Sequence, residues 1–208
     1  MTNSPHVPAP TIVVFDLGKV LLDWDPRYLY RGMFADEAEM EAFLAEVCTS
    51  DWVLEADRGR PFAQGCAELA ARFPRYEAAI RAFDERWQDM LVGEIEGAVA
   101  LKRQLQARGA PLYAISNFSR EKFAETAVRF PVVTDFLGVV VSAHEGLVKP
   151  DPAIFRLFLD RYGLSAAECL FIDDSLANVA SARQVGMQAT HFTTPEALEA
   201  DLKGLGLL

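Results

Sequence analysis

The fold of the chain is decided by the stretch Thr11-Ile12-Val13-Val14-Phe15-Asp16-Leu17-Gly18-Lys19-Val20. Its run of β-branched and aromatic residues predicts a buried strand that ends at the carboxylate of Asp16. In open α/β sheets, ligands bind beyond the carboxyl ends of the strands, so Asp16 is expected at a site of chemistry. Three more polar pairs follow apolar stretches in the same way: Ser116-Asn117, Lys149-Pro150 and Asp173-Asp174. Together the four segments predict a site for a phosphate group and a divalent cation.

The second half of the chain alternates between apolar runs and amphipathic segments. The expected strands are residues 111–115, 136–141, 169–172 and 187–192, and the expected helices are 99–107, 119–130, 151–162, 176–185 and 195–202. Strands that alternate with helices are typical of a parallel sheet covered on both faces. The sequence therefore predicts the α/β fold class, with a Rossmann-like core.

The segment from Pro26 to Met90 is different, because it has little β-branching and is rich in Ala, Glu, Arg and Leu. Helices are expected at residues 26–34, 36–47, 62–73 and 76–90, with a short piece near Trp52. No strand is expected between Asp16 and Gly97. We therefore predict a helical cap, residues 23–95, inserted after the first strand of a core formed by residues 1–22 and 96–208.

Composition narrows the class of partner. The chain has 208 residues, of which 51% are hydrophobic, and its formal net charge is −10. This charge argues against binding to nucleic acid or to an anionic membrane surface, both of which need clustered basic residues. A small phosphorylated substrate is still compatible, because a bound cation can reverse the field inside one cleft. A monomer and a homodimer are both left open.

No part of the sequence indicates export or membrane insertion. Residues 1–10 contain three prolines but no basic region or apolar stretch, so they predict a loose arm rather than a signal peptide. No segment approaches the roughly 20 apolar residues that a membrane span needs. The three cysteines, Cys48, Cys66 and Cys169, are far apart and predict buried thiols rather than disulfides or a zinc site. A cytoplasmic protein is expected.

The four polar segments supply the groups that phosphoryl transfer needs. The carboxylate of Asp16 can attack phosphorus and form an aspartyl-phosphate. The charge on the transferring group must be neutralised, which Mg²⁺ can do with oxygen ligands such as Asp16 and Asp173 or Asp174. Lys149 adds a fixed positive charge. The Ser116 hydroxyl, together with backbone N–H groups at the start of the next expected helix, would hold the phosphate oxygens.

These segments resemble, in order, the four motifs of the haloacid dehalogenase-like hydrolases. The matching residues are Phe15-Asp16-Leu17-Gly18-Lys19-Val20, Ile115-Ser116-Asn117, Lys149-Pro150-Asp151-Pro152 and Phe171-Ile172-Asp173-Asp174. The resemblance runs from about Thr11 to about Phe192, and the helical insertion is similar to the α-helical cap of the family. Each motif alone is weak, whereas four in the right order at strand ends are specific.

The resemblance implies a role for each matching residue. Asp16 would be the nucleophile and Lys149 its catalytic partner, while Ser116, Asn117 and Lys149 would bind phosphate. The metal would be held by Asp16, Asp174 and the backbone carbonyl of Gly18, with Asp173 in support. Mg²⁺ is the expected metal, and Mn²⁺ is an alternative because it prefers the same oxygen ligands.

The chain departs from the family pattern at Gly18, where most phosphatases of the family carry a second Asp as general acid and base. Without this acid, the rate of the step that protonates the leaving group should fall by about 10²- to 10⁴-fold. A good leaving group, such as the anomeric hydroxyl of a sugar phosphate, would need the acid less. Alternatively Asp23, Asp25 or another cap residue replaces it.

This departure keeps two other functions open. A metal-independent 2-haloacid dehalogenase would use the same Asp nucleophile without an acid, because halide leaves unprotonated; the acidic pair Asp173-Asp174 argues against it. A non-catalytic phosphate-binding module is the second alternative, since a fold does not settle function.

Four cap residues are candidates for contact with substrate: Trp24, Asp25, Arg58 and Arg60. Arginine suits phosphate or carboxylate, and Trp24 stands where the core passes into the cap. A solvated surface turn explains the arginines equally well, and packing explains the tryptophan.

Overall fold

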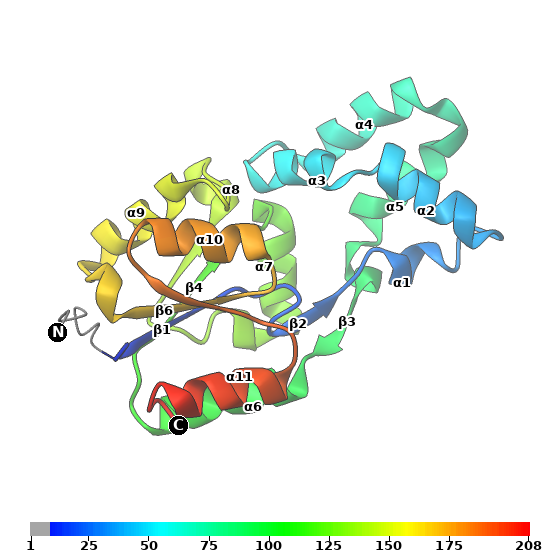
Figure 1. Ribbon diagram of the computed structural model, residues 1–208. Coiled ribbons are helices and arrows are strands. Elements are labelled where there is room, and N and C mark those ends of the chain that lie inside the picture. Colours follow the sequence, from blue (N-terminus) through cyan, green and yellow to red (C-terminus); the bar gives the residue numbers. More distant parts are fainter. Residues whose placement is uncertain (1–8) are drawn as a thin grey trace, which may run out of the picture.

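The computed structural model describes residues 9–208 and contains a five-stranded sheet in the order β5-β4-β1-β6-β7. All four pairings are parallel. The strands are β1 (Ile12–Phe15), β4 (Leu112–Ser116), β5 (Gly138–Val141), β6 (Cys169–Asp173) and β7 (Gln188–His191). The expected α/β class is confirmed, and β1 lies at the centre of the sheet (Figure 1).

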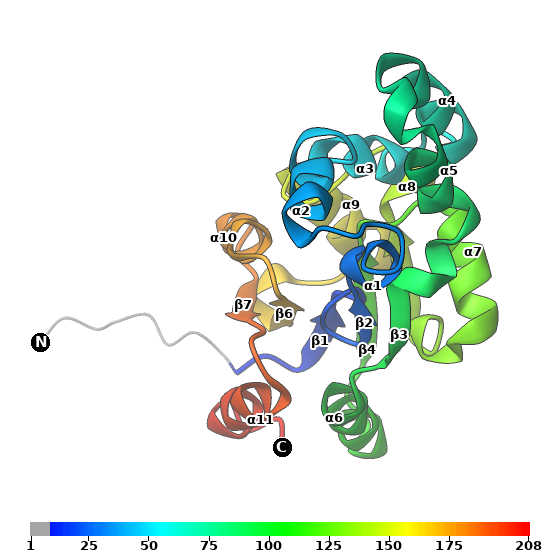
Figure 2. The same ribbon diagram turned by 90° about the vertical axis from the view of Figure 1, so that its right-hand side faces the viewer.

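Helices cover both faces of this sheet. On one face, α6 (Glu96–Ala107) and α11 (Pro195–Gly204) lie side by side, and α7 (Arg120–Arg129) packs against the same core (Figure 2). The opposite face is covered by α9 (Pro152–Tyr162) and α10 (Leu176–Gln184). The alternation within β1 explains the two layers, because Val13 and Phe15 enter one apolar cluster while Ile12 and Val14 enter the other.

A second, two-stranded sheet connects the core to a helical region. In it β2 (Leu22–Trp24) pairs antiparallel with β3 (Leu91–Glu94). The expectation that no strand lies between Asp16 and Gly97 is therefore wrong. These strands have three and four residues, and the paired residues are 67 to 72 positions apart in the sequence, so local sequence carried little signal for them.

The helical region between β2 and β3 lies at one end of the molecule, away from α6 and α11 (Figures 1 and 2). Its helices are α1 (Arg27–Tyr30), α2 (Glu37–Glu46), α3 (Ser50–Asp57), α4 (Phe62–Arg72) and α5 (Glu77–Glu85). Two 3₁₀ turns, Pro74–Tyr76 and Trp87–Met90, flank α5. Below, "cap" denotes this region.

Aromatic rings form the centre of the cap and reach the core. Phe83 lies 5.1 Å from Trp52 and 5.8 Å from Phe62, measured between ring centroids. Trp87 is buried and stands 6.0 Å from Phe118, which follows β4 in the core. Aromatic pairs at these separations attract each other beyond their burial, so this contact helps to fix the cap on the core.

The remaining sequence predictions concern membrane-spanning helices, the cysteines and the N-terminal arm. Among residues 9–208, no helix is long and apolar enough to cross a membrane. Cys48, Cys66 and Cys169 are free and buried, as predicted. Of the predicted N-terminal arm, residues 1–8 lie outside the described residues. A short helix, α8 (Ser142–Glu145), follows β5 and was not predicted.

Candidate active site

The three central strands of the large sheet deliver the predicted polar residues to one edge. Asp16 directly follows β1, and its backbone N–H donates to the carbonyl of Ile172 in β6 at 2.9 Å. Ser116 ends β4 and Asp173 ends β6. Because the strands are parallel and in register, their carboxyl ends meet, as the sequence analysis predicts.

One carboxylate oxygen of Asp16 is held by three donors. Its Oδ1 accepts hydrogen bonds from the backbone N–H of Leu17 at 2.7 Å and from the Ser116 hydroxyl at 2.9 Å. The ammonium of Lys149 lies 2.9 Å from the same atom. All three contacts fall on Oδ1, which fixes the carboxylate group and leaves Oδ2 as the oxygen available for a new bond.

Lys149 is buried between two carboxylates. Its Nζ also lies 2.7 Å from Oδ2 of Asp173 and donates to the carbonyl of Ile115 at 3.0 Å, so all three ammonium protons have partners. Asn117 fixes the backbone of this lysine, donating to its carbonyl at 2.9 Å and accepting from its N–H at 2.8 Å. Burial opposes the charged form, but the carboxylates of Asp16 and Asp173 raise the pKa of Lys149 above its ordinary value.

These contacts define what the predicted phosphate ligands do in this structure. The polar groups of Ser116, Asn117 and Lys149 hold Asp16 and one another. A hydroxyl has one proton, so Ser116 cannot donate to Asp16 and to a phosphate at the same time. Direct phosphate contact by these three residues stays a prediction, whereas the fixed charge of Lys149 acts at a distance without any change of partner.

The acids of the site repel one another. Burial raises the pKa of Asp16 to about 7, and Asp173 and Asp174 act in the same direction, against the lowering effect of Lys149. Burial and then the charge of Asp173 also raise the pKa of Asp174. A cation placed among these groups would relieve the repulsion.

The residues present fit a divalent metal ion. Asp16, Asp173 and Asp174 each offer a carboxylate oxygen, and these oxygens lie within 4.8 Å of one another. Hard oxygen donors of this kind are the ligands that Mg²⁺ prefers. Asp173 already accepts bonds from Lys149, from the Ser175 N–H and from Asn178, so its lone pairs are committed. Asp16 and Asp174 are the better placed ligands.

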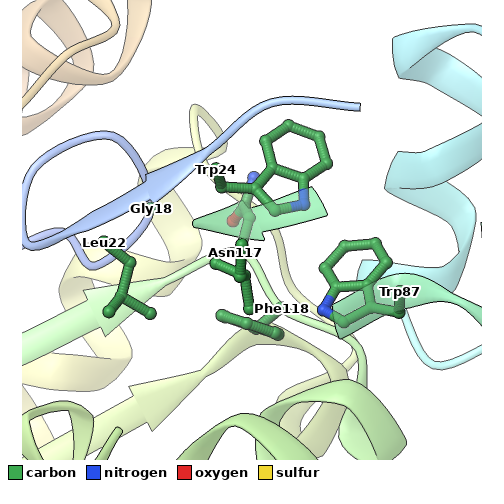
Figure 3. A pocket seen from close by; sticks show the side chains of 7 residues that line it. Gly18, Leu22, Trp24, Trp87, Asn117 and Phe118 are labelled. Atoms are coloured by element: carbon green, nitrogen blue, oxygen red, sulfur yellow. The ribbon is translucent and has the colours of Figure 1, made fainter. Parts of the chain in front are cut away.

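A pocket of about 80 Å³ opens beside this edge (Figure 3). Its lining is mostly apolar: Gly18, Leu22, Trp24, Trp87, Leu91, Asn117 and Phe118. The indole rings of Trp24 and Trp87 stand 5.6 Å apart between centroids. Within the described chain, neither indole Nε1 has a hydrogen-bond partner, although both are buried. Gly18 and Asn117 join this pocket to the carboxylate edge.

Of the four cap candidates, only Trp24 is brought to this pocket. Asp25 accepts a hydrogen bond from the N–H of Arg27 at the start of α1. Arg58 directly follows α3, is exposed, and pairs with Glu55 of that helix. Arg60 donates to the carbonyl of Trp52 inside the cap. Contact between these three residues and a substrate stays a prediction.

Two residues of the site were missed by sequence reasoning. Asn178, in the first turn of α10, donates to both oxygens of Asp173 at 3.0 and 3.1 Å. Its spacing of five residues after Asp173 was the one available signal. Asp57 ends α3 in the cap and is buried. The charge of Asp16 raises its pKa and the charge of Lys149 lowers it. Only the fold brings it there.

Comparison with known proteins agrees with these motifs. Residues 10–186 match the family described as haloacid dehalogenase-like hydrolase. The chain belongs to the haloacid dehalogenase-like hydrolases. The protein is thus a hydrolase of this family, and the resemblance carried by the four motifs is confirmed.

The similarity to three known proteins extends over most of the chain. A sesquiterpene phosphatase of Aspergillus oryzae is 28% identical over 204 residues, which cover 92% of this chain and 94% of that protein. A HAD-like family hydrolase of Porphyromonas gingivalis superposes with a TM-score of 0.71 at 23% identity, covering 95% of this chain and 98% of the other. A HAD family enzyme of Bacteroides thetaiotaomicron, solved with magnesium and inorganic phosphate, has a TM-score of 0.66 at 21% identity and covers 89% and 95%. The two solved structures share the fold.

Proposed function

We propose that this hydrolase is a Mg²⁺-dependent phosphatase that cleaves a small phosphate monoester through an aspartyl-phosphate on Asp16. The observation that carries the proposal is the held carboxylate of Asp16. Three donors fix its Oδ1, and the carboxylate cluster with Asp173 and Asp174 adjoins it. A nucleophile with one oxygen anchored and one available is arranged for in-line attack.

The reaction runs in two displacements. In the first, Oδ2 of Asp16 attacks phosphorus, the bond between phosphorus and the ester oxygen breaks, and the alcohol leaves. In the second, water attacks the phosphorus of the aspartyl-phosphate, the bond to Asp16 breaks, and inorganic phosphate is released. Through both steps Lys149 stays charged and opposes the negative charge that gathers at the site.

Asp16 and Asp174 would hold the metal, with the Gly18 carbonyl as a further ligand and Asp173 as the residue that fixes Lys149. When bound, Mg²⁺ would neutralise the phosphoryl oxygens and favour the ionised form of Asp16. That effect matters here, because burial holds the pKa of Asp16 near 7 without it.

The relatives support the phosphatase over the other two functions. The full-length fungal relative is named a sesquiterpene phosphatase, and a Bacteroides enzyme of the same fold was solved with magnesium and phosphate. A metal-independent dehalogenase would leave the repulsion within the carboxylate cluster unrelieved. A non-catalytic module would not need the Oδ1 of Asp16 held by three donors.

The cap would control access to the site. We propose the boundaries of the sequence analysis, residues 23–95 for the cap and 1–22 with 96–208 for the core, because the β2-β3 ribbon is the crossing between them. Movement about this ribbon would open the site for product release and close it against water.

Hydrolysis of p-nitrophenyl phosphate tests the proposal. We expect turnover by the wild type with Mg²⁺, none above background with EDTA, and none by Asp16→Asn under either condition. Asp160→Asn, an exposed carboxylate on α9, is the matched control and should keep wild-type activity. Turnover that persists in Asp16→Asn or in EDTA would contradict the mechanism, and no wild-type turnover would overturn the function.

A further inference from the structure

Asp57 is a buried carboxylate that the mechanism above leaves unused. It is the last residue of α3 and is only 8% exposed. The turn after it lies against the core, since a Cβ added to Gly59 would stand 3.4 Å from the carbonyl oxygen of Ala143 in α8. The backbone N–H of Ser119, at the start of α7, acts on the Asp57 carboxylate and lowers its pKa. Asp57 is thus a cap side chain seated at the core.

The charged groups that act on Asp57 belong to the active site. Burial raises the pKa of Asp57 to about 7, and the charge of Asp16 acts in the same direction. Lys149 and the Ser119 N–H act the other way. Among the described residues, no hydrogen bond joins Asp57 to Asp16, Asp173 or Asp174. The charges of Asp16 and Lys149 therefore act on Asp57, while no hydrogen bond ties it to either residue in the described chain.

We propose that Asp57 is the general acid and base of the reaction, supplied by the cap in place of the carboxylate that Gly18 lacks. The inference rests on the proposed phosphatase function. In the first step, the carboxyl proton of Asp57 passes to the ester oxygen as its bond to phosphorus breaks, and the alcohol leaves neutral. In the second, the Asp57 carboxylate takes a proton from the water that attacks the aspartyl-phosphate.

The other candidates for this role are occupied elsewhere. Asp23 accepts a hydrogen bond from the Tyr28 hydroxyl at 2.9 Å, on the surface of the cap. Asp25 accepts a hydrogen bond from the Arg27 N–H at 2.8 Å and lies 3.3 Å from the guanidinium of the same residue. In the described chain, neither Asp23 nor Asp25 forms a hydrogen bond or ion pair with Asp16 or Lys149. The charges of Asp16 and Lys149 both act on the pKa of Asp57.

The dependence on leaving group tests this role. We expect Asp57→Asn to lose about 10²- to 10⁴-fold in kcat/KM for an alkyl phosphate, whose alkoxide needs a proton. For p-nitrophenyl phosphate, whose phenolate leaves without one, the loss should stay under about tenfold, by the same reasoning. Glu55→Gln, exposed on the same helix, is the control and should match the wild type.

A pH profile measured at saturating Mg²⁺, which favours the ionised form of Asp16, gives a second readout. An acid must be protonated to act, so kcat/KM for the alkyl phosphate should fall as pH rises above about 7, the pKa of Asp57, in the wild type and not in Asp57→Asn. Asp57→Glu should restore part of the rate and keep this fall. Equal losses on both substrates in Asp57→Asn, or no loss on either, would overturn the role. Absence of wild-type turnover would instead overturn the phosphatase function.

The pocket beside Gly18 carries a second inference, which also rests on the phosphatase function. Its walls are the side chains of Leu22, Leu91 and Phe118 and the two indole rings. No charged side chain lines it, and a sugar would need several polar partners for its hydroxyls. Figure 3 shows the nitrogen of Trp87 on the ring edge nearest Phe118.

We infer that the alcohol part of the substrate is an apolar, planar or unsaturated group rather than a sugar. The pocket adjoins Asn117 and Gly18, so a phosphoryl group at Asp16 would direct its ester substituent there. The unpartnered indole N–H groups can donate to an ester or hydroxyl oxygen at its edge.

Competing substrates test this inference. We expect kcat/KM for an aryl or allyl phosphate to exceed that for glucose phosphates at least tenfold. Trp87→Phe keeps the ring contacts but removes the indole donor, so it should raise KM for the apolar substrate more than KM for the glucose phosphate. Preference for a sugar phosphate, or an equal effect on both substrates, would overturn it. If no substrate turns over, the phosphatase function fails instead.

Discussion

At the scale of single residues, the site is organised by a few side chains whose hydrogen-bonding groups all have partners. The ammonium group of Lys149 donates to Asp16, Asp173 and the Ile115 carbonyl, and Asn117 fixes the backbone of Lys149. Sequence motifs predicted that these residues would meet. They did not predict that the expected phosphate ligands would hold Asp16, because hydrogen-bond partners depend on distances that only the folded sheet sets.

Asn178 tests whether these supporting contacts matter. Replacing Asn178 with Ala removes two hydrogen bonds to Asp173 and should let Asp173 and its neighbour Asp174 shift. Outer partners of metal ligands typically contribute about 10- to 100-fold in metal affinity or activity, and we expect a loss of this size in apparent Mg²⁺ affinity. Titration of phosphatase activity with Mg²⁺ measures it. An unchanged Mg²⁺ dependence would show that Asp173 keeps its place without Asn178.

At the scale of elements, the parallel sheet was predictable and the ribbon was not. Strong apolar periodicity marked β1, β4 and β6, and their shared direction then placed the polar residues at one edge. The β2-β3 ribbon depends on pairing across the whole cap, which no local pattern records. The same cause hid Asp57, whose proposed role depends on α3 lying against α8.

The packing of α9 on the sheet gives a prediction at this scale. A Cβ added to Gly138 in β5 would overlap the ring of Tyr162, and that ring is confined by Tyr113 and Phe158. Gly138→Ala should therefore cost about 1–3 kcal/mol in the free energy of unfolding. Gly204→Ala in α11 meets nothing within 4 Å and is the matched control, with no loss expected. Urea denaturation compares the two; equal stabilities would mean that Tyr162 moves freely.

At the scale of the whole molecule, an acidic chain is proposed to bind an anion. The net charge of −10 argues against partners that need a basic surface, but it says nothing of one buried site. At that site, Lys149 and a bound cation would outweigh the local carboxylates. Composition therefore bears on the class of partner, while the proposed choice of substrate depends on the pocket between core and cap, which composition does not describe.

Metal binding should stabilise the whole fold, because it favours the native state over the unfolded one. At a Mg²⁺ concentration of one hundred times Kd, the gain is about 2.7 kcal/mol. We expect Tm to rise with Mg²⁺ and to return to its starting value with EDTA. Asp174→Asn should abolish most of this rise, and Asp160→Asn should keep it. A wild-type Tm that does not change when Mg²⁺ is added would contradict the assignment of the metal site.

The stereochemical course at phosphorus tests the central claim most directly. Each in-line displacement inverts the configuration at phosphorus, so a reaction through an aspartyl-phosphate on Asp16 must end with net retention. Hydrolysis of a phosphate monoester made chiral with oxygen isotopes, in isotopically labelled water, measures this outcome. We predict retention. Inversion would show a single attack by water, and it would remove Asp16 from its role as nucleophile.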